Sequence, residues 1–349
     1  MISRSGDGGS VVLFKRPNSS YIDWAFPLET EIERAATIDQ LNIEEGFLFF
    51  PFDRRSTHPL FSIHSSFQKA DISLFTSIQG QNGSFTEDPI NSTSEQDHIH
   101  AISKALVDIK NNTVEKVVLA RRRSLNGHVE PVSAFIKAAL KYPEAFVFLV
   151  RLPDVGTWLG ASPERLLQIV NGSAQIDSLA GTQRSRSGER RRKWEDKEFE
   201  EQRIVTVYID EILNEIELPH NWSTVQDKLA GDLIHLHASA QFSIRWGSNK
   251  AWDLVDRLHP TPAVCGTPKE NALKLIERLE NFDREYYTGI LGPVSQNGST
   301  DLFVNLRCMN IFDDRVEIYA GGGITEDSDP KAEWLETEYK CRTMMDLLS

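Results

Sequence analysis

The chain has 349 residues, enough for about two domains or for one large domain with a smaller lead-in. Hydrophobic residues make up 40% and charged residues 26%, which is typical of folded globular proteins and excludes a disordered or fibrous chain. The formal net charge of −13 opposes extended contact with nucleic acid or with an anionic membrane surface. An anionic small-molecule ligand would need a local cluster of Lys, Arg or metal to reverse that sign.

The number of cysteines and the length of the apolar runs indicate where in the cell the protein is located. Cys265, Cys308 and Cys341 form no CxxC pair and are odd in number, which argues against a disulfide framework or a cysteine zinc site. The first residues lack the apolar core of a signal peptide, and runs such as 145–150 are far shorter than the roughly 20 residues that span a bilayer. We expect a cytoplasmic protein that does not cross a membrane.

The first part of the chain contains short strand-like runs at 11–14 and 46–52, broken by Asn, Ser and Gly. The polar stretch that follows, at 79–98, marks the predicted boundary. We therefore divide the chain into a variable lead-in, residues 1–95, packed on a main catalytic domain, residues 96–349.

Helices and strands then follow without the regular alternation of a doubly wound sheet. Helices are predicted at 98–109, 131–142, 196–213, about 269–281, and from Pro330 onward. Strands are predicted at 116–125, 144–152, 157–169 (two strands joined by a tight turn), 173–181, 286–295, 301–312 and 315–324. The long helix from Asp196 carries an apolar stripe formed by Phe199, Ile204, Tyr208, Ile209 and Ile212. The pattern predicts a mixed, largely antiparallel α+β architecture.

The closing helix has a well-marked start, because Asp329 is a good N-cap and Pro330 is favoured at the first helical position. In that register Glu333, Glu336 and Lys340 fall at i, i+3 and i+7, so two carboxylates and an ammonium share one helical face.

Glu198 and Glu201 repeat the i, i+3 spacing in the earlier long helix. Two carboxylate pairs on two helices could converge on Mg²⁺, which takes oxygen ligands. The same spacing is also common on solvated helix faces, so spacing alone leaves both interpretations open.

Three further patterns have two interpretations each. The glycines of GGGI (321–324) let backbone N–H groups approach an anion, or they form a strand-to-helix turn. The basic stretch 184–193 lacks interleaved aromatic residues except Trp194, which favours a solvated loop over nucleic-acid binding. His235 and His237 have strand spacing for two metal ligands, but without a third ligand nearby we expect hydrogen-bonding histidines.

Eight segments, read in order, resemble the chorismate-utilising enzymes, and among them the isochorismate synthases. They are KVVLAR (116–121), GASPERLL (160–167), SLAGT (178–182), HPTPAVCGTPK (259–269), REYYTGILG (284–292), LFVNLRC (302–308), YAGGGI (319–324) and EWLETEYK (333–340). The resemblance covers about 250 residues, from near His98 to the C-terminus. It implies the α+β fold of the aminodeoxychorismate synthase type, with two large, mostly antiparallel sheets flanked by helices.

The resemblance also implies catalytic roles. Lys116 matches the general base that deprotonates water attacking C2 of chorismate, and Glu164 matches the general acid that protonates the departing C4 hydroxyl. Both roles need shifted pKa values, since Lys116 must lose a proton near neutral pH and Glu164 must hold one. The implied reaction converts chorismate to isochorismate, an isomerase activity.

Metal and substrate contacts are implied in the same way. Glu201 and Glu336 match Mg²⁺ ligands, with Glu198 and Glu333 as their supporting partners, and the metal holds the ring carboxylate. Substrate-binding positions match Gly181, Thr182, His235, Ala263, Tyr287, Arg307, Gly321, Gly323 and Lys340.

Differences from the aminodeoxychorismate and anthranilate synthases indicate which reaction of the family to expect. Ala180 stands where aminodeoxychorismate synthases carry a nucleophilic Lys, and SLAGT and HPTPAVCG differ from the usual anthranilate synthase segments. Gln202 stands where many relatives have His, and its amide can still hydrogen-bond a carboxylate. We predict an isochorismate synthase of menaquinone or siderophore biosynthesis; a salicylate synthase and a non-catalytic chorismate-binding relative are the alternatives. The sequence does not fix the oligomeric state.

Overall fold

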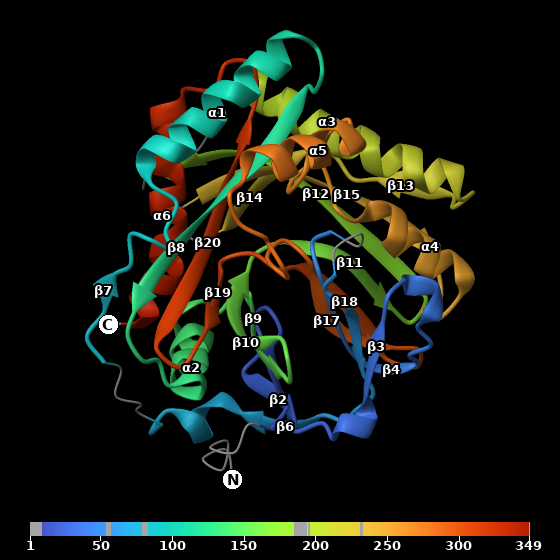
Figure 1. Ribbon diagram of the computed structural model, residues 1–349. Coiled ribbons are helices and arrows are strands. Elements are labelled where there is room, and N and C mark those ends of the chain that lie inside the picture. The colour runs from blue at the N-terminus through green and yellow to red at the C-terminus, as the bar shows by residue number, and fades with distance from the viewer. Residues whose placement is uncertain are drawn as a thin grey trace.

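The computed structural model describes residues 9–53, 57–78, 83–184, 194, 196–230 and 233–348. In these residues two antiparallel sheets of ten strands each dominate the fold (Figure 1). The first sheet has the order β16 (Gly266–Thr267), β8 (Lys116–Asn126), β20 (Arg315–Ile324), β19 (Cys308–Ile311), β10 (Gly156–Ser162), β9 (Phe146–Leu152), β1 (Val11–Lys15), β2 (Tyr21–Ala25) and β6 (Gln68–Asp71), with β7 (Thr86–Glu87) on β8. The second has the order β13 (His220–Trp222), β15 (Leu233–Ser243), β12 (Ser173–Arg184), β11 (Arg165–Val170), β18 (Ser299–Val304), β17 (Ile290–Ser295), β4 (Glu45–Phe50), β5 (Leu60–Ile63) and β3 (Ile32–Ala35), with β14 (Gln226–Ala230) on β15.

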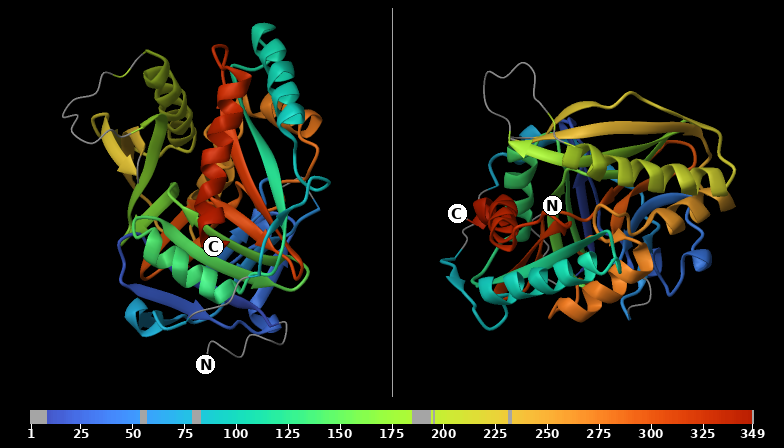
Figure 2. Two further views of the ribbon diagram at one scale, coloured as in Figure 1. Left: turned by 90° about the vertical axis from the view of Figure 1, so that its left-hand side faces the viewer. Right: turned by 90° about the horizontal axis from the view of Figure 1, so that it is seen from above.

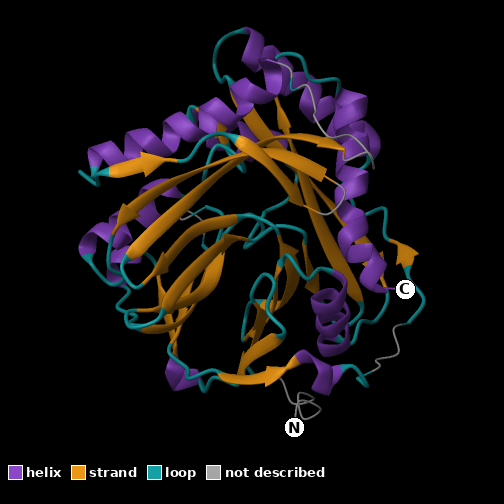
Figure 3. Ribbon diagram, turned by 180° about the vertical axis from the view of Figure 1, so that it is seen from behind, coloured by secondary structure: helices purple, strands orange, loops and turns teal. Residues whose placement is uncertain are grey.

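Helices cover the outer faces of both sheets (Figures 1 and 3). The α-helices are α1 (Glu95–Lys110), α2 (Pro131–Lys141), α3 (Asp196–Glu215), α4 (Asn249–Leu258), α5 (Lys269–Leu279) and α6 (Pro330–Leu348). Short 3₁₀ turns lie at Glu29–Glu31, Ile38–Gln40 and Ile72–Phe75. None of the helices in this part of the chain is both long and apolar enough to span a membrane.

The hydrophobic core has separate layers that reflect this arrangement. One cluster packs α3 and α4 on the second sheet, and another packs α2 and α6 on the first. A third cluster, rich in aromatic rings, fills the space between the two sheets, and a fourth packs α1 and α5 near the start of β8. The predicted α+β class, with two large antiparallel sheets flanked by helices, is confirmed.

Strand β9 shows how the sequence produces the layers. Its residues FVFLV are apolar without a break, and successive side chains of a strand point to opposite faces. Phe146 and Phe148 enter the cluster between the sheets, while Val147 and Leu149 pack under α2. A strand covered on both faces has no solvated side, which is why it lacks polar alternation.

The first 95 residues contribute strands to both sheets. Strand β1 pairs with β9 through Val11–Lys15, and β4 pairs with β17 through Glu45–Phe50. Phe14 and Phe47 belong to the cluster between the sheets. The division at residue 95 stays a prediction, because these contacts show that the two parts share a core without showing where a domain ends.

Most predicted elements are confirmed, but three details are wrong. Residues 286–289 form a turn before β17, and 301–312 is two strands, β18 and β19. The GGGI segment is the end of β20, as the strand predicted at 315–324 indicates, and the alternative of a strand-to-helix turn does not hold. On α3, Ile209 and Ile212 of the predicted stripe are buried and Tyr208 packs against the same cluster, whereas Phe199 is 47% exposed.

Candidate active site

Strands β8 and β20 form the floor of the predicted site. They pair antiparallel along their full lengths, with Gly323 opposite Val118 and Gly321 opposite Ala120. Lys116 begins β8 and is 6% exposed. A Cβ atom at position 323 would lie 2.9 Å from Cε of Lys116, so the glycine leaves the space through which the lysine side chain passes.

Helix α6 supplies a second lysine to the same place. It packs against β20 (Figure 2), and Asp329 caps its start by accepting a hydrogen bond from the Ala332 N–H at 2.8 Å. Lys340 Nζ donates to the Gly321 carbonyl at 2.7 Å and lies 2.7 Å from Glu336 Oε1. The predicted helix register is thus confirmed, and it directs Lys340 onto the glycine segment.

Glu164 lies in the tight turn between β10 and β11. Its backbone N–H donates to Ser162 Oγ and its carbonyl accepts from the Val304 N–H, so the turn is fixed to β18. Burial raises the pKa of Glu164 to about 7, and the nearby charges of Lys116 and Lys340 oppose that rise. A carboxyl group with this pKa is partly protonated at neutral pH, as a general acid requires.

Tyr287 and Arg307 are placed by two turns that are held together by Asn305. The Asn305 N–H donates to the Gly289 carbonyl at 2.7 Å, and its side-chain amide donates to the Tyr286 carbonyl at 2.8 Å. Asn305 is fully buried, and sequence analysis did not single it out. The sequence signal that could have identified Asn305 was its place in VNLR (304–307), between a predicted strand and Arg307.

Arg307 adopts a left-handed backbone conformation, with φ of 49°, which is uncommon for a residue with a side chain. Burial lowers the pKa of Arg307, while the nearby groups of Tyr287 and Glu336 oppose that change. The Tyr287 hydroxyl lies 3.2 Å from where a Cβ atom of Gly321 would be. Strained backbone conformations are common at functional sites, and here the strained residue is one whose guanidinium lies near Tyr287 and Glu336.

The predicted site residues therefore come together from distant parts of the sequence. The cluster brings together two lysines, an arginine, a tyrosine and a carboxyl group with a raised pKa, and its members are Lys116, Glu164, Tyr287, Arg307, Gly321, Gly323, Glu336 and Lys340. This cluster supplies the local positive charge that a chain with a net charge of −13 needs to bind an anion.

Ala263 belongs to the same neighbourhood. A narrow crevice is lined by Glu164 and Ala263, together with Thr261 and Leu179. The loop that carries Ala263 follows α4, a helix that sequence analysis missed although its buried residues Ala251, Leu254, Val255 and Leu258 have helical spacing.

The predicted metal ligands are only partly described. Glu333 Oε1 accepts from Ser328 Oγ at 2.8 Å, and its Oε2 lies 3.1 Å from where a Cβ atom of Gly322 would be. Glu198 is half-buried near the start of α3, whereas the side chain of Glu201 lies outside the described part of the structure. The described side chains contain no group of three His, Cys, Asp or Glu residues arranged to hold a metal. All four predicted ligands are carboxylates, a donor set that fits Mg²⁺.

The remaining candidates lie on β12, β15 and α3. The backbone of Gly181 and Thr182 follows a register shift after Ala180, and Thr182 pairs with His235; the side chains at 180–184 and the basic stretch 185–193 lie outside the described residues. His237 Nε2 lies 3.0 Å from Asp177 Oδ1, an ion-pair distance, and the hydrogen-bonding role expected for His237 stays a prediction.

Gln202 is buried at 5% exposure, and its Nε2 donates to Thr206 Oγ1 at 2.8 Å and to Ser178 Oγ at 3.3 Å. These bonds tie α3 to β12. They occupy the amide nitrogen that we expected to hydrogen-bond a carboxylate.

A buried ion pair that sequence analysis missed supports the site from below. The side chains of Arg284 and Glu280 are 2% and 3% exposed. Arg284 donates to the carbonyls of Val118 at 2.7 Å and Val264 at 2.9 Å, and Glu280 accepts from the Ala120 N–H at 2.7 Å. The pair therefore hydrogen-bonds the backbone groups of β8 just beyond Lys116, and it fixes the loop that carries Ala263 through the Val264 carbonyl.

We expect Arg284→Met to lower the free energy of unfolding by about 3–5 kcal/mol, because it leaves the Glu280 carboxylate buried without its cation. Urea denaturation at pH 7 measures the change. Arg278→Met is the matched control: Arg278 pairs with Asp108 at the surface, with 59% of its side chain exposed, so the loss should stay below about 1 kcal/mol. Equal losses in the two variants would show that the buried pair has no special structural role.

Comparison with known proteins agrees with this geometry. The profile of the family described as "Chorismate binding enzyme" matches residues 58–349. The chain belongs to this family. Among curated proteins, it is 34% identical to isochorismate synthase EntC of Escherichia coli strain K12 over 245 residues, which cover 67% of this chain and 62% of that protein. It is 30% identical to isochorismate synthase MenF of Bacillus subtilis over 270 residues, 73% of this chain and 56% of that protein. The chain thus matches less than two thirds of the length of these relatives.

Solved structures show the same fold over nearly the whole chain. The menaquinone-specific isochorismate synthase MenF of Escherichia coli aligns with a TM-score of 0.82 at 20% identity, covering 99% of this chain and 90% of that one. Anthranilate synthase component I of Streptococcus pneumoniae aligns with a TM-score of 0.71 at 18% identity, covering 98% and 93%. At these identities the likeness is one of fold.

Proposed function

We propose that the protein is an isochorismate synthase, which adds water at C2 of chorismate and removes the C4 hydroxyl. The observation that supports this proposal most strongly is the position of Glu164, whose pKa is raised to about 7 within the field of Lys116 and Lys340. Water activated by Lys116 would attack C2, and the proton held by Glu164 would pass to the C4 oxygen as it leaves. The curated relatives named above carry this activity in their names.

The cationic cluster suits the substrate because chorismate carries two carboxylates. Arg307 and Lys340 offer charged donors, and the Tyr287 hydroxyl offers a neutral one beside Gly321. Because these groups are held by strands and by α6, they keep their positions before substrate arrives, which lowers the reorganisation needed in the transition state.

We propose Mg²⁺ as the cofactor, held by Glu201 and Glu336 with Glu198 and Glu333 as supporting residues. When bound, the cation would neutralise the ring carboxylate of the substrate. Glu336 already lies 2.7 Å from Lys340, so this carboxylate faces the cationic cluster. The three cysteines are buried and unpaired, which fits a reducing compartment, and we propose the cytoplasm as the location.

The reaction product tests the proposal. The nucleophilic lysine of the aminodeoxychorismate synthases has no counterpart in this chain, because position 180 is alanine, and we therefore propose water as the nucleophile. In ¹⁸O-water with chorismate and Mg²⁺, we expect mass spectrometry to show isochorismate carrying one heavy oxygen, in reversible equilibrium with chorismate and without early pyruvate.

Other products would favour the alternatives. Salicylate with stoichiometric pyruvate would identify a salicylate synthase, and binding of chorismate without turnover would identify a non-catalytic relative. An enzyme–substrate adduct, or an aminated product formed with ammonium, would refute water as the nucleophile. The relatives include proteins named for menaquinone and for siderophore routes, so we propose one of these two routes for the product.

A further inference from the structure

A second pocket, separate from the candidate active site, opens between the two sheets. Its volume is about 600 Å³, within the range of small-molecule sites. Arg34 of β3 and Phe61 of β5 line it from the second sheet, and Gly156 of β10 and Asn310 of β19 line it from the first. The turn before β17 closes it with Tyr286, whereas the adjacent Tyr287 faces the candidate active site.

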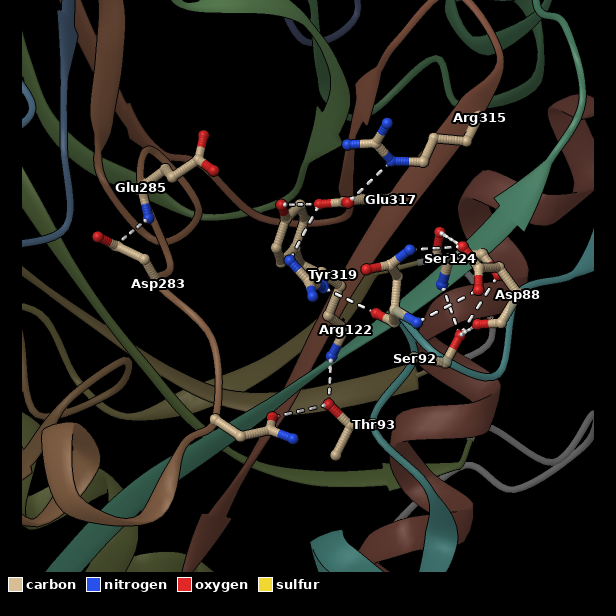
Figure 4. Close-up of polar contacts among 12 residues, drawn as sticks. Asp88, Ser92, Thr93, Arg122, Ser124, Asp283, Glu285, Arg315, Glu317 and Tyr319 are labelled. Carbon is tan, nitrogen blue, oxygen red and sulfur yellow. Dashed lines mark hydrogen bonds and ion pairs between the residues drawn. The ribbon is translucent and has the colours of Figure 1, made fainter.

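The cationic side chains of this pocket already have anionic neighbours. Arg34 lies 3.8 Å from Asp154, and His58 lies 3.1 Å from Asp283. Glu285, between Asp283 and Tyr286, is different: its backbone N–H donates to Asp283, but no described residue pairs with its carboxylate (Figure 4). Among the described residues, none therefore forms a direct ion pair with this acidic group, and His58 and Arg122 act on it only through their nearby charges.

The electrostatic surroundings of Glu285 reinforce this negative character. Burial raises the pKa of Glu285, and the charges of Glu317 and Asp283 raise it further, against the opposing charges of His58 and Arg122. In Figure 4, Arg315, Arg122 and Tyr319 all contact the Glu317 carboxylate. Their polar groups therefore bind Glu317 and not Glu285. A cation beside Glu285 would relieve the repulsion among the acidic groups.

Asn310 supplies a second polar atom, its amide oxygen, that has no hydrogen-bond partner among the described residues. It is 1% exposed and lines the pocket, yet its Oδ1 accepts no hydrogen bond from the described residues. Gly156 faces it, and a Cβ atom there would lie only 3.0 Å from that oxygen, so the glycine makes room for the amide. Buried polar groups are normally hydrogen-bonded, and a ligand with N–H donors would satisfy this one.

Aromatic side chains line the remainder of the pocket. The Tyr286 ring is fixed, because its hydroxyl donates to the Pro59 carbonyl at 3.0 Å and its face stacks on Phe49. Phe61 and Phe312 add further ring surface, and each already has an arginine over one face: Arg34 lies 5.8 Å from the centroid of Phe61 and Arg315 lies 3.9 Å from that of Phe312. Aromatic faces attract cations as well as apolar groups.

We propose that this pocket binds a small organic cation, an ammonium group carried on an apolar or aromatic body. The ammonium would donate to the Glu285 carboxylate and the Asn310 amide oxygen, and the body would pack on Tyr286, Phe61 and Phe312. This inference does not depend on the proposed function, since it concerns different side chains and is tested by binding alone.

The test compares three molecules with the same phenyl body and different charges. Isothermal titration calorimetry at pH 7 would measure phenethylamine as the cation, 3-phenylpropionate as the anion and phenylalanine as the zwitterion. We expect phenethylamine to bind at least tenfold more tightly than either of the others. Preferred binding of 3-phenylpropionate or phenylalanine, or no binding of phenethylamine, would overturn the proposal.

Variants locate the binding. Glu285→Gln should weaken phenethylamine binding at least tenfold, and Glu285→Lys should reverse the preference toward 3-phenylpropionate. Glu144→Gln is the matched control, because Glu144 is exposed and does not line the pocket. Circular dichroism of each variant confirms that it is folded. Unchanged affinity in folded Glu285→Gln would show that the cation binds elsewhere and refute the assignment.

Discussion

We expect Lys116→Ala and Glu164→Gln each to lower kcat for isochorismate formation by at least about a hundredfold, because a general acid or base contributes about 10²–10⁴-fold. Chorismate should still bind, since the cationic groups of Arg307 and Lys340 are unchanged. Steady-state kinetics with purified variants measures the loss, and equilibrium binding of chorismate separates a catalytic defect from a binding defect.

Matched controls are available for both changes. Lys104→Ala removes an exposed lysine from α1, and Glu277→Gln neutralises an exposed carboxylate on α5. Both controls should keep the wild-type rate. A Lys116→Ala or Glu164→Gln enzyme that retains more than about a tenth of that rate would remove the residue from its assigned role.

The pKa of Glu164 adds a pH dependence whose direction is fixed by its role. A general acid must be protonated, and burial raises the pKa of Glu164 to about 7. In the forward direction kcat/KM should therefore decline as pH rises above about 7, approaching a tenfold loss per pH unit. The residual activity of Glu164→Gln should lack this decline.

The fold was predictable where local patterns decide it. Helix α6 begins at Pro330 as its cap residue Asp329 indicates, and β9 is a strand because five apolar residues fill two buried faces. Phe199 shows the limit of such patterns: periodicity identifies the apolar stripe on α3, in which Ile209 and Ile212 are buried, but it does not reveal that Phe199 stays 47% exposed.

The candidate site was predictable only in part, for a similar reason. The motif matches identified Lys116, Glu164 and Arg307, each of which contributes a reactive or charged group. They did not identify Asn305 or the Arg284–Glu280 pair, which act by holding backbone groups of other segments. Such roles depend on contacts between residues far apart in the chain, which no local spacing encodes.

The role of the glycines of β20 also depends on residues that are distant in the sequence. The strand predicted at 315–324 includes these three glycines, but local reasoning leaves open a turn or an anion-binding loop at the same place. In the structure they lie in a central strand, where missing side chains leave room for Lys116 at Gly323 and for the Tyr287 hydroxyl at Gly321. Their function is defined by what occupies the space above them.

The metal hypothesis predicts the second large effect. EDTA should abolish isochorismate formation, Mg²⁺ should restore it, and Glu201→Ala or Glu336→Ala should reduce it to a level that added Mg²⁺ does not rescue. The physical reason is that Mg²⁺ takes oxygen ligands and that the Glu336 carboxylate lies beside Lys340 in the cationic cluster. Glu200→Ala is the control, because this neighbour of Glu201 pairs with Arg203 at the surface.

A readout other than activity separates a metal site from a general loss of function. A ligand that binds only the folded state stabilises it by about 2.7 kcal/mol at a hundred times its dissociation constant, so Mg²⁺ should raise the Tm of the wild type and of Glu200→Ala. The rise should be much smaller in Glu336→Ala and Glu201→Ala. Full activity in EDTA would refute the metal requirement, and an unchanged Tm response in Glu336→Ala would assign the ligand to another residue.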